Sequence, residues 1–173
     1  MLLTPGPTPV PEFVRKAMAD VTIHHRTEEF EAIFKNTREL LIEIYDMPEV
    51  VILASSGTGA MEACVTNLTH KKALTINSGK FGERFGKICA AFGIDYTEIK
   101  NEWDTPVSVE VVVNAIKADS SIDAVFIQIC ESAGGLRHPV EQIAAEVKKI
   151  NKDITIVADG ITAIGVEKID TTN

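Results

Sequence analysis

Apolar residues follow two alternating patterns along this chain, and together they predict alternating strands and helices. Short, nearly continuous apolar runs are typical of strands that are buried on both faces of a sheet. Between these runs, apolar residues recur every three or four positions, as in helices with one buried face. The runs predict strands at 50–54, 73–77, 95–99, 124–129 and 154–158. The periodic segments predict helices at about 11–19, 27–45, 109–118 and 140–150, with two more opening after Ser55–Gly59 and Ser78–Gly79.

Strands of this kind, separated by helices, indicate a three-layer α/β/α fold with a mostly parallel sheet. The first eleven residues differ, because Pro stands at every second position from Pro5 to Pro11. Proline fixes φ and removes a backbone donor, so we expect an extended arm there. The sequence therefore predicts an arm and short helix over 1–22 and an α/β domain over 23–173.

Composition narrows the classes of partner. The formal net charge is −8 with no basic run, which argues against a nucleic-acid partner. The N-terminus lacks the basic and apolar regions of a signal peptide, and no apolar run is long enough to span a membrane. The three cysteines are widely spaced, which argues against disulfides and a zinc site. We therefore expect a cytoplasmic protein with no metal.

Ligands of parallel sheets bind beyond the carboxyl ends of the strands, and three segments lie at such ends. Ser55–Gly59 is a glycine-rich turn that opens a helix. Such a turn offers bare N–H groups and the positive end of the helix dipole to an anion, although an ordinary turn can need the same glycines. It is not a P-loop, because no Gly-Lys-Ser/Thr follows.

The other two strand ends are Gln128–Gly135 and Asp159–Thr162. The polar, glycine-rich stretch from Glu131 to Gly135 is either a ligand-lining loop or a simple crossover. Asp159 ends an apolar strand, so we expect it to be partly buried. A buried carboxylate needs a cation or hydrogen-bond donors, which here are either a ligand's ring nitrogen or the N–H groups of the following turn.

Taken together and in order, these segments resemble the class V aminotransferases, in particular the alanine–glyoxylate / serine–pyruvate aminotransferase branch. The resemblance extends over essentially the whole chain. It rests on the following segments: Leu3–Pro9, His25–Phe30, Ser56–Ala63, Phe81–Arg84, Glu131–Ser132 and Asp159–Gly165. It implies the large domain of a pyridoxal phosphate (PLP) enzyme of the aspartate aminotransferase-like fold, with PLP as cofactor.

The resemblance also implies roles for individual residues. Gly57 and Thr58 would hold the PLP phosphate, and Phe81 would stack on the pyridine ring. Asp159 would pair with the protonated ring nitrogen and is the expected catalytic residue. Gly6 is expected near the substrate through its backbone. The expected cofactor-binding residues are Ser56, Gly57, Thr58, Phe81, Ser132, Asp159 and Thr162.

The lysine that binds PLP covalently in this family follows the aspartate segment. Lys168 lacks the Ser-rich context of such a lysine, and Lys80 precedes the aspartate. We therefore expect the Schiff-base lysine to lie beyond Asn173, so that residues 1–173 are the N-terminal part of an enzyme, with part of the large domain and the small domain absent. Such a fragment is expected to be inactive. The family also implies a homodimer.

The expected function is transfer of an amino group between a small amino acid (alanine, serine or aspartate) and a 2-oxo acid such as glyoxylate or pyruvate. Three alternatives stay open. Two are enzymes of the same fold: a 2-aminoethylphosphonate aminotransferase and a cysteine desulfurase, although Phe81 stands where a desulfurase would carry histidine. The third is a noncatalytic phosphate- or nucleotide-binding α/β module.

Overall fold

A computed structural model of the chain describes residues 2–4 and 6–172. The chain divides into two compact units, Met1–Ile52 and Leu53–Asn173. The first unit contains helices α1 (Glu12–Met18) and α2 (Glu28–Tyr45). Thr27 caps α2, because its side-chain oxygen accepts a hydrogen bond from the backbone N–H of Phe30 at 3.3 Å. Both helices were predicted from the sequence.

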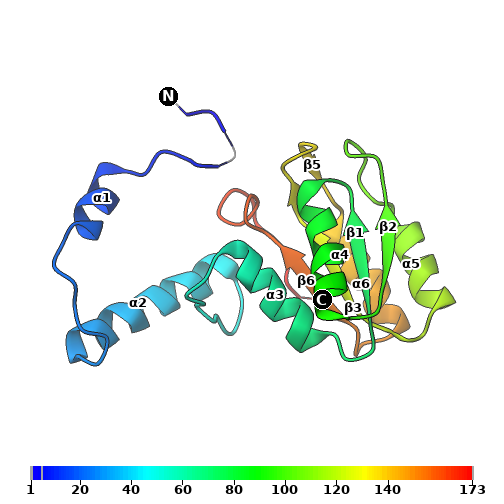
Figure 1. Cartoon of the computed structure of the whole chain (residues 1–173), viewed down its shortest axis with the longest axis horizontal. Helices are drawn as coiled ribbons and strands as arrows, with labels where there is room; N and C mark the ends of the chain where they lie inside the picture. The colour runs from blue at the N-terminus through cyan, green and yellow to red at the C-terminus, as the bar shows by residue number, and fades with distance from the viewer. Residues whose placement is uncertain (1, 5, 173) are drawn as a thin grey trace. The chain divides into compact units, whose positions relative to one another are not determined.

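The second unit has a parallel four-stranded sheet in the order β2-β1-β3-β6 and a small two-stranded sheet (Figure 1). Its strands are β1 (Lys72–Asn77), β2 (Tyr96–Lys100), β3 (Ile122–Gln128), β4 (Cys130–Glu131), β5 (Leu136–Arg137) and β6 (Thr155–Asp159). Its helices are α3 (Gly57–Leu68), α4 (Lys80–Phe92), α5 (Val109–Ala118) and α6 (Val140–Ile150).

Two apolar clusters lie on opposite faces of the large sheet. One joins alternate residues of β1 and β3, including Leu74 and Val125, to the buried faces of α5 and α6. The other joins Ala73 and Phe126 to the buried faces of α3 and α4, with the rings of Phe85 and Phe126 5.2 Å apart. Helices thus cover both faces of a parallel sheet, which confirms the predicted three-layer α/β/α fold.

The predicted strand at 50–54 is wrong. Residues 50–54 form no strand, and Val51 is 81% exposed. A strand requires hydrogen bonds to a neighbouring strand, and this segment pairs with neither β2 nor β6, the edges of the sheet. The apolar residues at 50–54 have a high propensity for strands, but propensity alone does not provide a neighbouring strand to pair with.

The loop after β3 also differs from a plain crossover. Cys130 and Glu131 pair with Arg137 and Leu136 in a short antiparallel hairpin. The N–H of His138 then returns to the carbonyl of Ile129 at 2.9 Å. Because β1, β3 and β6 are parallel neighbours, this hairpin, the start of α4 and the loop after β6 all follow carboxyl ends at one edge of the sheet.

Candidate functional site

The start of α3 is an exposed turn with donors available to an anion. Ser56 caps the helix by accepting the Gly59 N–H on its side-chain oxygen at 3.3 Å. The N–H groups of Gly57 and Thr58 belong to the first helical turn, which has no acceptor inside the helix. Gly57 is exposed. Because a serine hydroxyl that accepts one hydrogen bond keeps its proton, Ser56 can also donate to the same anion.

Thr58 is joined to α4 through Arg84. The Nη1 of Arg84 donates to the Thr58 hydroxyl at 3.0 Å, and the guanidinium carbon lies 5.3 Å from the centre of the Phe81 ring. Residues 81 and 84 face the same way because they are one helical turn apart. The structure therefore brings together Thr58 and Phe81, which the sequence had predicted separately. The linking arginine was not predicted, although its spacing from Phe81 was a signal.

The start of α4 already holds a carboxylate of the chain itself. Glu131 is fully buried, and its Oε2 accepts the N–H groups of Phe81 at 3.1 Å and Gly82 at 2.8 Å. Its Oε1 accepts the N–H of Ala133 at 3.2 Å. Gly79 makes room for it, since a Cβ at this position would lie 2.5 Å from the Glu131 side chain. Glu131 thus fixes the backbone of Phe81 relative to the hairpin that carries Ser132.

The hairpin is itself held by a buried histidine. His138 Nδ1 accepts the backbone N–H of Val107 at 3.1 Å. Burial lowers the pKa of His138 to about 4, which keeps the imidazole neutral and able to accept near neutral pH. The His138 backbone therefore closes the base of the hairpin that carries Glu131 and Ser132, and the His138 side chain anchors the hairpin to the loop before α5.

Asp159 ends β6 and is partly buried, as the sequence predicted. Its Oδ1 accepts the N–H of Ile161 at 3.1 Å, which is the turn-capping contact foreseen as one alternative. A Cβ on Gly57 would lie 3.8 Å from Ile161 Cδ1, so the start of α3 adjoins this turn. Burial, and then the negative charge of Asp159, raise the pKa of the Cys64 thiol on α3. Asp159 and the start of α3 thus share one region.

Two predicted residues have more limited support. The hydroxyl of Thr162 donates to the carbonyl of Cys130 at 3.2 Å, which ties the β6 turn to the hairpin and commits its proton. Its oxygen keeps lone pairs that can accept from a ligand. Gly6 lies in the N-terminal unit, and its contact with substrate stays a prediction.

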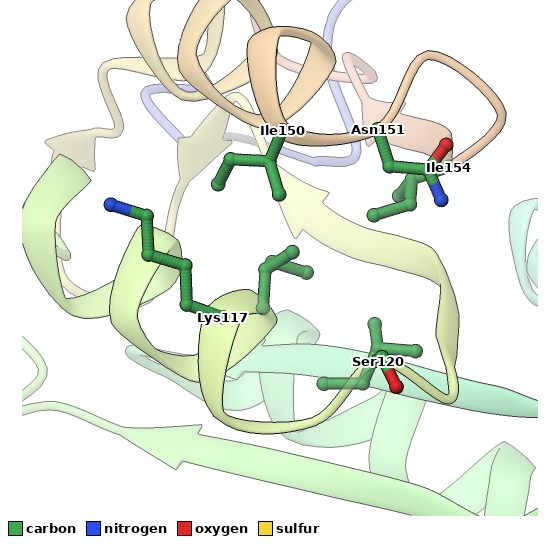
Figure 2. Close-up of a pocket in the computed structure, with 7 residues that line it drawn as sticks. Lys117, Ser120, Ile150, Asn151 and Ile154 are labelled. Atoms are coloured by element: carbon green, nitrogen blue, oxygen red, sulfur yellow. The ribbon is translucent and has the colours of Figure 1, made fainter.

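A separate cavity of about 400 Å³ lies at the opposite end of the sheet (Figure 2). It is lined by residues from the C-terminal ends of α5 and α6 and from the segments that enter β3 and β6, namely Ile116, Lys117, Ser120, Ile122, Ile150, Asn151 and Ile154. Because it lies at the amino ends of the strands, it falls outside the region where parallel sheets bind ligands.

The described residues contain no group of three or more His, Cys, Asp or Glu side chains that could hold a metal ion. None of the helices that the structure describes is both long enough and apolar enough to cross a membrane.

Comparison with known proteins identifies the fold and the family. The fold matches aspartate aminotransferase of subgroup IV from Thermus thermophilus with a TM-score of 0.89 and 30% identity, covering 96% of this chain and 47% of that one. The chain therefore has the fold of the large domain of a PLP-dependent aminotransferase. A model of the family described as Aminotransferase class-V matches residues 3–173. The chain belongs to the class-V aminotransferase family.

Two curated relatives place the chain within this family. It is 50% identical over 173 residues to an uncharacterized aminotransferase of Helicobacter pylori (strain J99 / ATCC 700824), covering 100% of this chain and 47% of the relative. It is 31% identical over 175 residues to 2-aminoethylphosphonate–pyruvate transaminase of Pseudomonas fluorescens, covering 98% of this chain and 47% of the relative. The chain thus spans about half the length of the curated relatives it matches.

The family and fold imply pyridoxal phosphate as the cofactor, and the residues present fit this group. An anion fits the exposed start of α3, where a capping serine and two first-turn N–H groups meet. An aromatic ring, Phe81, follows the carboxyl end of β1, and a carboxylate, Asp159, ends β6 at the same edge of the sheet. These are the three chemical elements that PLP requires: a phosphate cradle, a stacking surface and a partner for the ring nitrogen.

Proposed function

We propose that the protein to which this chain belongs is a PLP-dependent aminotransferase that moves an amino group between a small amino acid and a 2-oxo acid. Alanine, serine or aspartate would be the donor, and glyoxylate or pyruvate the acceptor. The observation that carries the proposal is the proximity of the Asp159 turn to the open start of α3: Asp159 accepts the N–H of Ile161, and a Cβ on Gly57 would lie 3.8 Å from Ile161 Cδ1.

Each site residue has a defined task in this proposal. Ser56, Gly57 and Thr58 donate hydrogen bonds to the phosphate, and Phe81 stacks on the ring. Asp159 holds a proton at the pyridine nitrogen through Oδ2, since its Oδ1 accepts from Ile161. When bound, PLP supplies an electron sink that stabilises negative charge at the substrate Cα.

Ser132 and Thr162 lie beside this arrangement. Ser132 follows Glu131 directly, so the contacts of Glu131 with the start of α4 keep Ser132 at the site edge. We propose that the Ser132 hydroxyl donates a hydrogen bond to a ring oxygen of PLP. We also propose that the Thr162 oxygen accepts a hydrogen bond from PLP. Assembly as a homodimer and a location in the cytoplasm stay predictions.

A second candidate is transfer of the amino group from 2-aminoethylphosphonate to pyruvate. It is favoured by the 31% identity to the Pseudomonas fluorescens transaminase. Family membership favours either transaminase over the nucleotide-binding module considered from the sequence. Activity assays of the full-length protein with alanine, serine, aspartate and 2-aminoethylphosphonate as donors separate the two candidates.

Asp159→Ala in the full-length protein tests the proposal. We expect turnover to fall by at least about a thousandfold, because the ring nitrogen loses the charge that keeps it protonated. The matched control is Asp153→Ala, an exposed aspartate before the opposite end of β6, which should leave turnover within about twofold of wild type. Near-normal turnover of a folded Asp159→Ala protein would refute the assignment.

A further inference from the structure

Arg84 contacts two of the proposed cofactor-binding residues at once. Its guanidinium donates to the Thr58 hydroxyl at 3.0 Å and lies over the Phe81 ring, 5.3 Å from the ring centre. These two partners come from different helices, α3 and α4. The side chain thus ties the residue proposed to bind the phosphate to the residue proposed to stack on the ring.

The contact determines what the Thr58 hydroxyl can do. A threonine hydroxyl has one proton and two acceptor lone pairs, and a guanidinium can only donate. Because Thr58 accepts from Arg84, its proton is left to donate elsewhere. A cationic donor also polarises the hydroxyl and makes it a better donor to an anion. Arg84 therefore turns Thr58 into a directed donor at the start of α3.

Arg84 differs from the lysines of the same helix in its ionic contacts. Among the carboxylates of the described residues, none forms an ion pair with Arg84. The neighbouring lysines on the same helix behave differently, since Lys80 and Lys87 both pair with Glu83 at 3.1 and 2.8 Å. A positive charge next to a helix N-terminus, with no ion-pair partner among the described residues, reinforces the attraction of that turn for a phosphate.

The Phe81 ring is fixed by the same group. A guanidinium over one face of an aromatic ring is attracted by the negative π-face and restricts the side chain. An aromatic ring has two faces, so this contact is compatible with stacking of a cofactor on the other. The phosphate donor and the stacking ring are thereby held in register by one side chain.

We propose that Arg84 is a positioning residue for the cofactor, which orients Thr58 toward the phosphate and holds Phe81 for stacking. This inference rests on the proposed function, because it requires that PLP bind at α3. The opposing view is that Arg84 only joins α3 to α4, in which case its loss would lower the stability of the protein but not its selectivity for the phosphate.

The test measures the affinity of the full-length apoprotein for PLP and for pyridoxal, which lacks the phosphate, by the visible circular dichroism of the bound ring. Arg84→Met should weaken PLP binding about tenfold or more, and pyridoxal binding much less. Arg84→Lys keeps the charge but loses the planar fork. Its affinity for PLP should therefore lie between those of the wild type and Arg84→Met. Lys87→Met removes a positive charge from the same helix and serves as the matched control, with binding within about twofold of wild type.

A double-mutant cycle assigns the effect to the contact with Thr58. Thr58→Val should weaken PLP binding, and adding Arg84→Met to it should weaken binding less than Arg84→Met does in the wild type. Urea unfolding of each apoprotein corrects for loss of stability. The inference would be overturned if Arg84→Met left the affinity for PLP unchanged. It would also be overturned if Arg84→Met weakened the binding of PLP and of pyridoxal equally, and if this loss added to that caused by Thr58→Val. Failure of the wild-type protein to bind PLP would overturn the proposed function and this inference with it.

Discussion

The N-termini of helices α3 and α4 have similar sequences but differ in the groups that lie against their first-turn N–H groups. Ser55 and Ser56 precede α3, which begins with Gly57, and Ser78 and Gly79 precede α4. The α3 start is capped by the neutral Ser56 and exposes Gly57, whereas the α4 start is filled by the buried carboxylate of Glu131. A helix N-terminus attracts anions in general, so what decides its use is whether the chain already supplies one.

The two starts therefore have different tasks. The carboxylate at α4 comes from the chain and makes a rigid support for Phe81 and Ser132. The anion for α3 would come from the ligand. A variant that removes the carboxylate at the start of α4 should therefore lower stability. A variant at the start of α3 should instead lower the affinity for the cofactor.

Removal of the α4 carboxylate should give the larger effect on stability. Glu131→Ala leaves the N–H groups of Phe81, Gly82 and Ala133 without their acceptor, so the free energy of unfolding should fall by about 3 kcal/mol or more. Urea unfolding followed by circular dichroism measures this loss. Glu110→Ala is the control, an exposed glutamate in the first turn of α5, where we expect a loss of at most about 1 kcal/mol. Equal losses in the two variants would mean that Glu131 is not the internal anion of α4.

A smaller, pH-dependent effect should come from His138, which anchors the hairpin that carries Glu131. Its pKa is lowered to about 4 in the folded protein, whereas an unfolded histidine titrates near 6.5. Between these values the unfolded chain binds a proton that the folded protein does not, so stability is complete above about pH 6.5 and is lost as the pH falls toward 4.

His138→Asn removes this titration while keeping an oxygen that can accept from Val107. We expect the variant to show a shallower loss of unfolding free energy between pH 6.5 and 4 than the wild type, as measured by urea unfolding at a series of pH values. The comparison uses the slopes, because the smaller side chain also lowers stability at every pH. Parallel slopes would show that His138 is not buried in the neutral form.

The layer architecture could be predicted from the sequence because β1 and β3, which are buried on both faces, read as nearly continuous apolar runs. The position of Asp159 at the carboxyl end of β6 could be predicted from its apolar run, whereas its role at a ligand site stays a prediction. The segment at 50–54 was misread because an apolar run records propensity and not the presence of a pairing partner.

The part of the site that was not predicted consists of contacts between residues distant in the chain. Glu131 bonds the start of α4, 49 residues before it, and Arg84 reaches Thr58, 26 residues before it. Neither contact leaves a periodic signal, because each depends on how separate loops meet at the sheet edge. The sequence places Glu131 in a polar loop, but its full burial follows only from the fold.

The most direct test of the central claim compares two backbone amides in the full-length apoprotein labelled with ¹⁵N-glycine. Gly57 opens α3, and Gly82 donates to Glu131 in α4. Amide chemical shifts are recorded with PLP and with pyridoxal, and the difference between them isolates the phosphate. We expect a large phosphate-dependent shift at Gly57 and a small one at Gly82. A phosphate-dependent shift at Gly82 with none at Gly57 would contradict the account.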